Sequence, residues 1–256
     1  MGNISLPRYE GTGVVVYSAV FGDYDEVLKA SPCDSINSFV LFSDNQDLAV
    51  EGWKVIYVQE ATFSPKDLNR IYKLKPHIYI PNASYTIYID GNIGFEGNAF
   101  KPLISYFKKN TIDIMTMTHF VRHNIYDEAE VLLRSSRIKP LALINEIRSY
   151  YLAGFRSQCS MGENTLIIRT NYGSQKTGEV WWKKYTNGCG RDQLSLPVVI
   201  WETKVSHGLY PFNVRELKSF KYQSHSMNSD RNVIKLILRY IFLVVPYKIV
   251  RKVLSF

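Results

Sequence analysis

Cysteine is scarce in this chain, with only three in 256 residues. The number is odd and no two of them form a C-x-x-C pattern, which argues against a disulfide framework and against a zinc knuckle. The N-terminal segment also lacks the apolar stretch of a secretory signal peptide. We therefore expect a cytoplasmic chain whose thiols are reduced.

Several catalytic signatures are also missing. The sequence contains no G-x-S-x-G, no G-x-x-x-x-G-K-[ST], no H-E-x-x-H and no G-x-G-x-x-G. Their absence weakens the interpretations of the chain as a hydrolase, a nucleoside triphosphatase, a metalloprotease or a dehydrogenase.

Acidic residues are absent from the C-terminal segment. Residues 231–256 hold six of the 31 lysines and arginines and none of the 23 acids, so most of the net charge of +8 lies there. The preceding residues are nearly neutral, and we expect no nucleic-acid partner. A polar stretch before this segment predicts a domain over 1–230 and a basic amphipathic tail over 231–256.

Long apolar runs are missing from the tail as well. Its apolar core, 236–245, is interrupted by Pro246, whereas a membrane-spanning helix needs about 20 apolar residues. Aromatic residues interspersed with lysine and arginine are typical of a helix that lies in the membrane interface. We expect the tail to bind an anionic surface at the inner face of the cell membrane. The alternative is a helix packed on the preceding domain.

Short β-branched runs and helical patterns alternate in the first half of the chain. Strands are predicted over 14–20, 38–43, 53–58, 85–90, 112–116 and 164–169. Helices are predicted over 65–75, 126–135, 141–152, 178–185 and 193–200, and Pro197 leaves the length of the last one open. The alternation predicts an α/β fold with a mixed, mostly parallel sheet flanked by helices.

Carboxylates follow three of the predicted strands. Asp23 follows the first strand, Asp44 the second, and Asp90 the strand Y-T-I-Y-I. Ligands of open α/β sheets bind at the carboxyl ends of the strands, so these residues mark a candidate site. Asp90 and Asn92 have oxygens suited to a hard divalent cation, and Gly91 lets the backbone approach phosphates. The alternative is a turn that merely ends a strand.

Two groups of polar residues provide further candidates. Arg70 and Lys73 are three residues apart on a predicted helix, where they suit a diphosphate, although a solvated helix face is the alternative. His119 and Arg122 follow the strand at 112–116 and suit a sugar hydroxyl, unless the histidine is a core residue.

Two more carboxylates stand where a loop meets a predicted element. Glu163 precedes the strand T-L-I-I-R, and Asp192 precedes an apolar helical stretch. Asp192 is equally suited to be a helix N-cap.

Several segments, taken in order, resemble one protein family. They are Y-S-A-V-F-G-D-Y-D (17–25), R-I-Y-K-L-K-P-H (70–77), Y-I-D-G-N-I (88–93), H-F-V-R-H-N-I-Y-D-E-A (119–129), G-E-N-T-L-I-I-R (162–169), V-W-W (180–182) and R-D-Q-L-S (191–195). Together they are similar to a glycosyltransferase-like domain, once classed as a domain of unknown function. It occurs in bacterial surface-polysaccharide gene sets and in plant Golgi proteins linked to mucilage and pollen tubes. The resemblance implies a GT-A-like, Rossmann-like fold that binds a nucleotide sugar at the first half of the sheet.

The resemblance also implies roles for particular residues. Y-I-D-G-N lies where related transferases carry Asp-x-Asp, and R-D-Q-L-S resembles the Asp-Gln element that faces the acceptor in retaining hexosyltransferases. His225 resembles the late histidine of a manganese site, with His207 as its competitor. The expected donor-binding residues are Ala19, Phe21, Asp23, Asp44, Arg70, Lys73, Asp90 and Gly91. The expected acceptor- or sugar-binding residues are His119, Arg122, Arg191 and Gln193, and the expected metal ligands are Asp90, Asn92 and His225.

The expected activity is transfer of a hexose, for example galactose, from a UDP-linked donor with the help of Mn²⁺ or Mg²⁺. The acceptor is a cell-surface polysaccharide such as O-antigen or capsule, or a lipid-linked glycan. If the reaction inverts configuration, Asp192 ahead of Glu163 deprotonates the acceptor hydroxyl. If it retains configuration, which the Asp-Gln element favours, Asp192 orients the sugar. Two alternatives stay open, a catalytically inactive nucleotide- or carbohydrate-binding domain, favoured by Asn92, and a membrane-associated scaffold, favoured by the tail.

Overall fold

The structure is a computed structural model that describes residues 6–22, 26–119, 121–135, 138–223 and 233–254. The chain divides into two compact units. The first unit comprises residues 1–118, 163–182 and 205–225, and the second comprises residues 119–162, 183–204 and 226–256. The domain boundary predicted near residue 230 lies outside the described residues. The described part of the tail belongs to the second unit.

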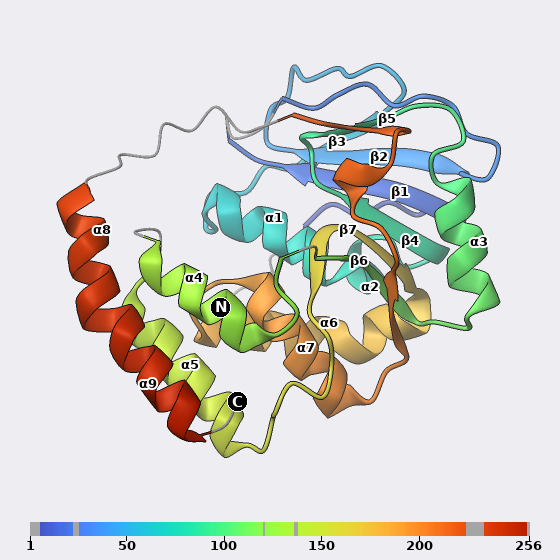
Figure 1. The fold of residues 1–256 in the computed structure, drawn as a ribbon. Coiled ribbons are helices and arrows are strands. Elements are labelled where there is room, and N and C mark those ends of the chain that lie inside the picture. The colour runs from blue at the N-terminus through green and yellow to red at the C-terminus, as the bar shows by residue number, and fades with distance from the viewer. Residues whose placement is uncertain (1–5, 23–25, 120, 136–137, 224–232, 255–256) are drawn as a thin grey trace. The chain divides into compact units, whose positions relative to one another are not determined.

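A seven-stranded sheet with the order β3-β2-β1-β4-β7-β6-β8 forms the centre of the first unit (Figure 1). Its strands are β1 (Gly13–Val20), β2 (Ser38–Ser43), β3 (Lys54–Tyr57), β4 (Ala83–Ile89), β6 (Ile114–Thr118), β7 (Gly162–Thr170) and β8 (His207–Tyr210). The pairs β1–β2, β1–β4, β2–β3 and β6–β8 are parallel, and β4–β7 is antiparallel. The predicted mixed, mostly parallel sheet is confirmed. The order β3-β2-β1-β4 is that of one half of a doubly wound, Rossmann-like sheet.

Further elements complete the first unit. They are α1 (Pro65–Leu74), α2 (Pro76–Tyr79), α3 (Lys101–Lys109), the first part of α6 (Asn171–Asn187), the short helix η1 (Val214–Glu216), and a small sheet of β5 (Ile93–Phe95) and β9 (Phe220–Tyr222). Helix α1 begins as predicted, because the Ser64 hydroxyl accepts a hydrogen bond from the N–H of Asp67 at 3.1 Å and Pro65 follows the cap.

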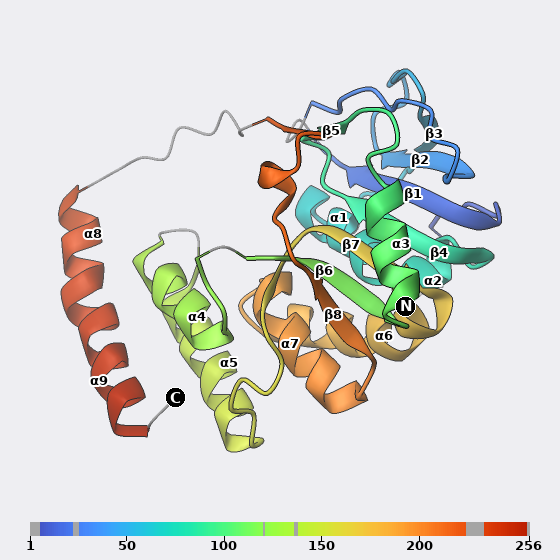
Figure 2. The ribbon, with the colours of Figure 1, turned by 45° about the vertical axis from the view of Figure 1, so that its right-hand side comes forward.

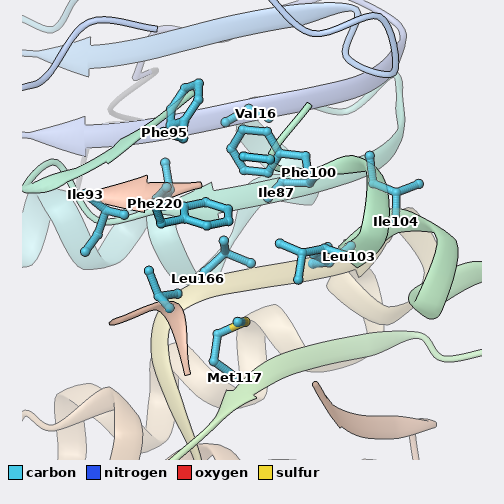
Figure 3. Packing of buried hydrophobic residues seen from close by; sticks show 14 of the residues in the cluster. Val16, Ile87, Ile93, Phe95, Phe100, Leu103, Ile104, Met117, Leu166 and Phe220 are labelled. Atoms are coloured by element: carbon cyan, nitrogen blue, oxygen red, sulfur yellow. The ribbon is translucent and has the colours of Figure 1, made fainter. Parts of the chain in front are cut away.

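The two faces of the sheet have different side chains. On one face, apolar residues of the sheet pack with residues from α3, β5 and β9, as Figure 3 shows. The labelled members are Val16, Ile87, Ile93, Phe95, Phe100, Leu103, Ile104, Met117, Leu166 and Phe220. Because side chains alternate along a strand, Tyr17 and Tyr88 point to the opposite face. There the Tyr17 hydroxyl contacts the carbonyl oxygens of Tyr72 and Lys73 in α1, both at 3.3 Å.

The second unit is helical in its described residues. Its elements are α4 (Ile125–Arg134), α5 (Pro140–Leu152), α7 (Asp192–Thr203), α8 (Val233–Arg239), the π-helical segment η2 (Tyr240–Val244) and α9 (Val245–Leu254). Buried apolar residues of α4, α5, α7 and η2 form its core. Helix α7 continues past Pro197 to Thr203. Helices α8 and α9 lie beside α4 (Figure 2). No described helix is long and apolar enough to cross a bilayer.

Candidate functional site

The turn after β4 places Asp90 at the carboxyl end of the sheet. The Asp90 N–H donates to the carbonyl of Thr165 at 2.9 Å, and its own carbonyl accepts from the N–H of Ile93 at 3.0 Å. Gly91 lies within this turn. The Asp90 side chain keeps 28% of its surface exposed. The carboxylate is therefore accessible at the edge where ligands of such sheets bind.

A buried lysine lies against this carboxylate. Lys73 Nζ is 3.3 Å from Asp90 Oδ1 and 4.6 Å from the centroid of the Tyr88 ring. Only 3% of the lysine side chain is exposed. Removing an ammonium group from water costs free energy, which the carboxylate and the ring face offset only in part. An ion pair of this kind therefore adds little to the free energy of unfolding. It does place a desolvated cation at the edge of the sheet where a ligand would bind.

Asn69 ties helix α1 to the end of β1. Its Nδ2 donates to the Ala19 carbonyl at 2.5 Å and to the Tyr88 hydroxyl at 3.3 Å. Arg70 Nη1 donates to the Asn69 Oδ1. These contacts gather predicted donor-binding residues from β1, α1 and the end of β4: Ala19, Arg70, Lys73 and Asp90. The sequence does not point to Asn69, because a single asparagine within a basic helical stretch carries no recognisable signal.

Asp44, at the end of β2, fastens the loop that follows β1. Both of its carboxylate oxygens accept from the N–H of Gly22 at 3.0 Å, and Gly22 has φ +63°, which glycine adopts without strain. Phe21 is buried and stacks on Tyr72 with ring centroids 5.7 Å apart. Asp44 also lines an open recess of about 500 Å³ together with Tyr57, Val58, Gln59, Glu60 and Ala61. Asp23 lies outside the described residues.

A buried arginine that the sequence patterns do not point to contacts Tyr17, whose hydroxyl in turn contacts the Lys73 carbonyl. Arg169 of β7 has no exposed surface, and its Nη2 donates to the Tyr17 hydroxyl at 2.5 Å. Burial raises the pKa of Tyr17 to about 12 although the Arg169 charge opposes the rise. Burial, and then the Asp90 charge, raise the pKa of Tyr88. Both tyrosines are therefore neutral hydrogen-bonding supports. An arginine inside the apolar strand T-L-I-I-R-T was the available signal.

The described residues around Asp90 do not by themselves fit a divalent cation. Asn92 is 5% exposed, its Nδ2 donates to the Gln223 carbonyl at 2.8 Å, and the Gln223 N–H donates back to the Asn92 carbonyl at 3.0 Å. Asn92 thus joins β5 to the end of β9. Lys73 already neutralises Asp90. No three His, Cys, Asp or Glu side chains gather as a metal site within the described ranges. The predicted ligand His225 lies outside those ranges.

Glu163, the second candidate base, has strong partners within the first unit. Its Oε1 is 2.6 Å from Arg215 Nη1, and its Oε2 accepts from Asn213 Nδ2. Asn213 also donates to the Thr118 carbonyl at 3.0 Å and caps η1. Both oxygens of the Glu163 carboxylate therefore have partners within the first unit. In the inverting alternative, this geometry favours Asp192 over Glu163 as the base.

The second unit contains a separate polar cluster around a buried carboxylate, Glu128. Arg122 Nε is 3.0 Å from Glu128 Oε2 and 3.1 Å from His119 Nε2. Burial raises the pKa of Glu128, the charges of Arg122 and Arg191 oppose the rise, and the charge of Asp192 adds to it. The cluster therefore joins three predicted acceptor-binding residues with the predicted base. The sequence does not single out Glu128, because three acids occur within about one helical turn there.

The start of α7 presents the other residues of the Asp-Gln element. Asp192 lies in the first turn and is 5% exposed, and Arg191 occupies the N-cap position. Among the described residues, Gln193 Nε2 has no hydrogen-bond partner although the atom is buried. An unpaired buried donor costs about 1–3 kcal/mol, which a bound hydroxyl or carbonyl oxygen would recover.

Among known proteins, this chain is similar to a plant protein and to a mouse protein of known structure. A protein of Arabidopsis thaliana named "Probable hexosyltransferase MUCI70" is 22% identical over 214 residues, which is 73% of this chain and 37% of that protein. The chain therefore spans little more than a third of the length of this relative. A crystal structure of mouse xyloside xylosyltransferase 1 in its apo form aligns with 77% of this chain and 85% of that one, at a TM-score of 0.44 and 9% identity.

A family model covers most of the chain. Residues 6–226 match the model described as "TOD1/MUCI70, glycosyltransferase-like domain". The match includes β1 to β9 and the two polar clusters described above, and it ends before α8. The chain therefore belongs to the TOD1/MUCI70 family of glycosyltransferase-like domains.

Proposed function

We propose that the chain transfers a hexose from a UDP-linked donor to a cell-surface polysaccharide or to a lipid-linked glycan. The observation that carries this proposal is the Lys73–Asp90 pair at the carboxyl end of β4. In a sheet with the order β3-β2-β1-β4, nucleotides bind at this edge. The name of the plant relative supports a hexose as the transferred group.

The chemistry of the leaving group explains the need for cations. The bond between the anomeric carbon and the β-phosphate oxygen breaks, and its electron pair goes to the phosphate. The UDP that leaves gains negative charge as this happens. Lys73 and Arg70 would stabilise that charge, and such contacts are strongest where water is excluded. Asp90 would hold the ammonium group of Lys73 in position.

The recess beside Asp44 is the proposed nucleoside site. Tyr57 is 41% exposed there and offers a ring face on which a uracil base can stack. Asp44 and Gln59 provide oxygens that accept hydrogen bonds from ribose hydroxyls. The same Asp44 accepts hydrogen bonds from the N–H of Gly22 after β1, which holds this carboxylate in place.

Asp192 is the residue that we assign to the acceptor or the transferred sugar. If the reaction inverts configuration, its carboxylate takes the proton of the acceptor hydroxyl as the new glycosidic bond forms. If the reaction retains configuration, which the Asp-Gln element favours, Asp192 and Gln193 orient the sugar instead. His119, Arg122 and Arg191 would then bind sugar or acceptor hydroxyls.

The second candidate is a domain of the same fold that binds a nucleotide or a glycan without catalysis. One observation favours this second candidate. The side-chain amide of Asn92 donates to the backbone of Gln223, so Asp90 is the one carboxylate in the Asp90-Gly91-Asn92 turn, where related transferases carry two. Such a domain would bind UDP through Lys73 and Asp44 and release no sugar.

A panel of nucleotide sugars separates the two candidates. The wild type, Lys73→Ala and the control Lys109→Ala, at an exposed end of α3, are incubated with each donor with and without EDTA. We expect turnover of a UDP-hexose by the wild type and by the control. Lys73→Ala should weaken UDP binding about 10- to 100-fold, because a charge-assisted contact is worth about 1.5–3 kcal/mol.

Two outcomes would contradict the proposal. UDP binding by the wild type without turnover of any donor would support the non-catalytic domain. Unchanged UDP affinity in Lys73→Ala would remove the lysine from the donor site. Loss of turnover in EDTA would show that the reaction requires a divalent cation.

A further inference from the structure

The C-terminal helices carry an apolar face that the described residues leave uncovered. Its side chains keep between 38% and 75% of their surface exposed. They are Ile237, Leu238, Ile241, Phe242, Val245, Ile249 and Val253. These seven residues, here called the outer face, extend along α8, η2 and α9. A row of this length differs from the scattered single apolar residues that ordinary protein surfaces show.

The opposite side of the same helices is fixed to α4. Arg239 Nε donates to the Leu133 carbonyl at 2.9 Å, and the Tyr247 hydroxyl donates to the Tyr126 carbonyl at 3.1 Å. Val244 is completely buried in the core of the second unit. Contacts that recur at about every fourth residue define one helical face, so the outer face is directed away from α4.

Part of the positive charge of the tail is neutralised by this packing. Lys248 Nζ is 3.2 Å from Glu130 Oε1, and Arg251 Nη2 is 2.7 Å from Asp127 Oδ1. Lys252 is exposed on α9, and the segment from residue 231 onward contains no acid. Within the segment from residue 231 onward, the outer face is therefore an apolar surface accompanied by positive charges alone.

We propose that the outer face binds the interface of an anionic lipid bilayer, with the helices parallel to the membrane plane. Apolar side chains would enter the boundary between headgroups and acyl chains, and Lys252 would contact lipid phosphates. A second copy of the chain is a poorer partner, because its own outer face would bring further cations and no carboxylate. The proposal goes beyond glycosyl transfer and does not depend on it.

The packing on α4 also changes the expected response to salt. Six basic residues in the sequence suggest a mainly electrostatic attraction, which salt screens. In the structure Lys248 and Arg251 pair with carboxylates, so burial of apolar surface is the main attraction. Binding should therefore persist at high salt, with only a moderate reduction.

Co-sedimentation with vesicles tests the proposal on the full chain. The vesicles contain phosphatidylglycerol and phosphatidylcholine in equal amounts. The double variant Ile241→Ser/Phe242→Ser changes only exposed side chains, so its thermal unfolding should match the wild type. We expect its vesicle binding to fall more than about tenfold, since two exposed apolar side chains of the outer face would no longer leave water on binding.

The matched control is Leu152→Ser, which removes an exposed apolar residue from α5 in the same unit. It should bind vesicles like the wild type. Failure of the wild type to sediment, equal losses in both variants, or abolition of binding by high salt would overturn the proposal. Light scattering without vesicles measures the molar mass of the wild type and of the double variant. A wild-type dimer that is lost in the double variant would show that the outer face binds a second copy of the chain.

A chain ending before residue 233 would be a poor test of the same idea. Removing the segment also removes Val244 and Tyr247 from the side of α4 that they cover. Loss of solubility in such a chain would then report exposure of α4, so substitutions on the outer face are the informative variants.

Discussion

Lys73 shows most clearly how a single residue acquires its role from the fold. In the sequence it belongs to a basic helical stretch of the kind that usually faces solvent. In the structure, α1 packs on the sheet face that carries Tyr17 and Tyr88, and Lys73 becomes buried beside Asp90. Its neighbour Arg70 contacts Asn69. Packing of α1 on the sheet therefore buries this one lysine of the basic stretch and places its charge at the edge of the sheet where a ligand would bind.

A double-mutant cycle tests whether this pair serves function more than stability. Asp90→Ala leaves the buried Lys73 without its carboxylate, and we expect it to lower the free energy of unfolding by about 1–3 kcal/mol. Lys73→Met in the same chain should restore most of that loss, because an apolar side chain suits the buried position. Urea unfolding of the two single variants and the double variant measures the cycle.

Activity provides the contrasting readout for the same variants. The double variant should be stable and unable to turn over a nucleotide sugar. A double variant that regained turnover along with stability would show that the pair only supports the fold.

At the scale of elements, the first unit contains short strands that the sequence did not reveal. β8 has four residues and pairs in parallel with β6, and β5 and β9 have three residues each. Such short strands show too few alternations for a pattern to be recognised. His207 begins β8, where its Nε2 is 3.2 Å from the Thr116 hydroxyl. The competing late histidine is thus an element of strand pairing.

The titration of His207 gives a prediction for β8. Burial lowers the pKa of His207 to about 4, below the ordinary value of 6.5. As the pH falls from 6.5 to 4, the unfolded chain binds a proton that the folded protein excludes, so stability is lost. We expect this residue to account for about 2 kcal/mol of that loss, which is less than the full shift implies because the residue is only partly buried.

Urea unfolding at several pH values checks this prediction. The free energy of unfolding of His207→Asn should depend less on pH between 6.5 and 4 than that of the wild type. Parallel pH profiles for the two proteins would show that His207 titrates alike in the folded and unfolded chains.

At the scale of the whole molecule, the two polar clusters belong to different compact units. Asp90, Lys73 and Asp44 lie in the first unit, while Glu128 and Asp192 lie in the second. Each unit is assembled from separate parts of the chain, so neither corresponds to a continuous segment. The donor and acceptor roles that we propose are divided between them in the same way.

Hydrogen exchange with UDP tests this division. UDP lacks the hexose that is transferred. It should therefore protect backbone amides of α1 and of the turn after β4 from exchange, and the exchange of amides in α4 should not change. At about 100 times its dissociation constant, a ligand that binds only the folded state stabilises it by about 2.7 kcal/mol. Mass spectrometry of peptides from residues 65–74, 83–93 and 125–134 measures the pattern. Protection confined to α4 would place the nucleotide on the second unit.

The sequence by itself determined the fold class and the location of the Asp90 turn. Apolar periodicity and caps are local properties, so β1, β2, β4 and α1 were predicted within a few residues of their observed bounds. The order of motifs also predicted the family, which the match over residues 6–226 confirms.

Only the tertiary structure decided what the polar side chains contact. Arg169 meets Tyr17 across 152 positions of sequence, and Asn92 meets Gln223 across 131. The same holds for the tail, where Tyr247 bonds to Tyr126 and a pattern that suits a membrane helix also packs on α4. Contacts between such distant positions follow from chain topology and burial, which no local pattern of residues specifies.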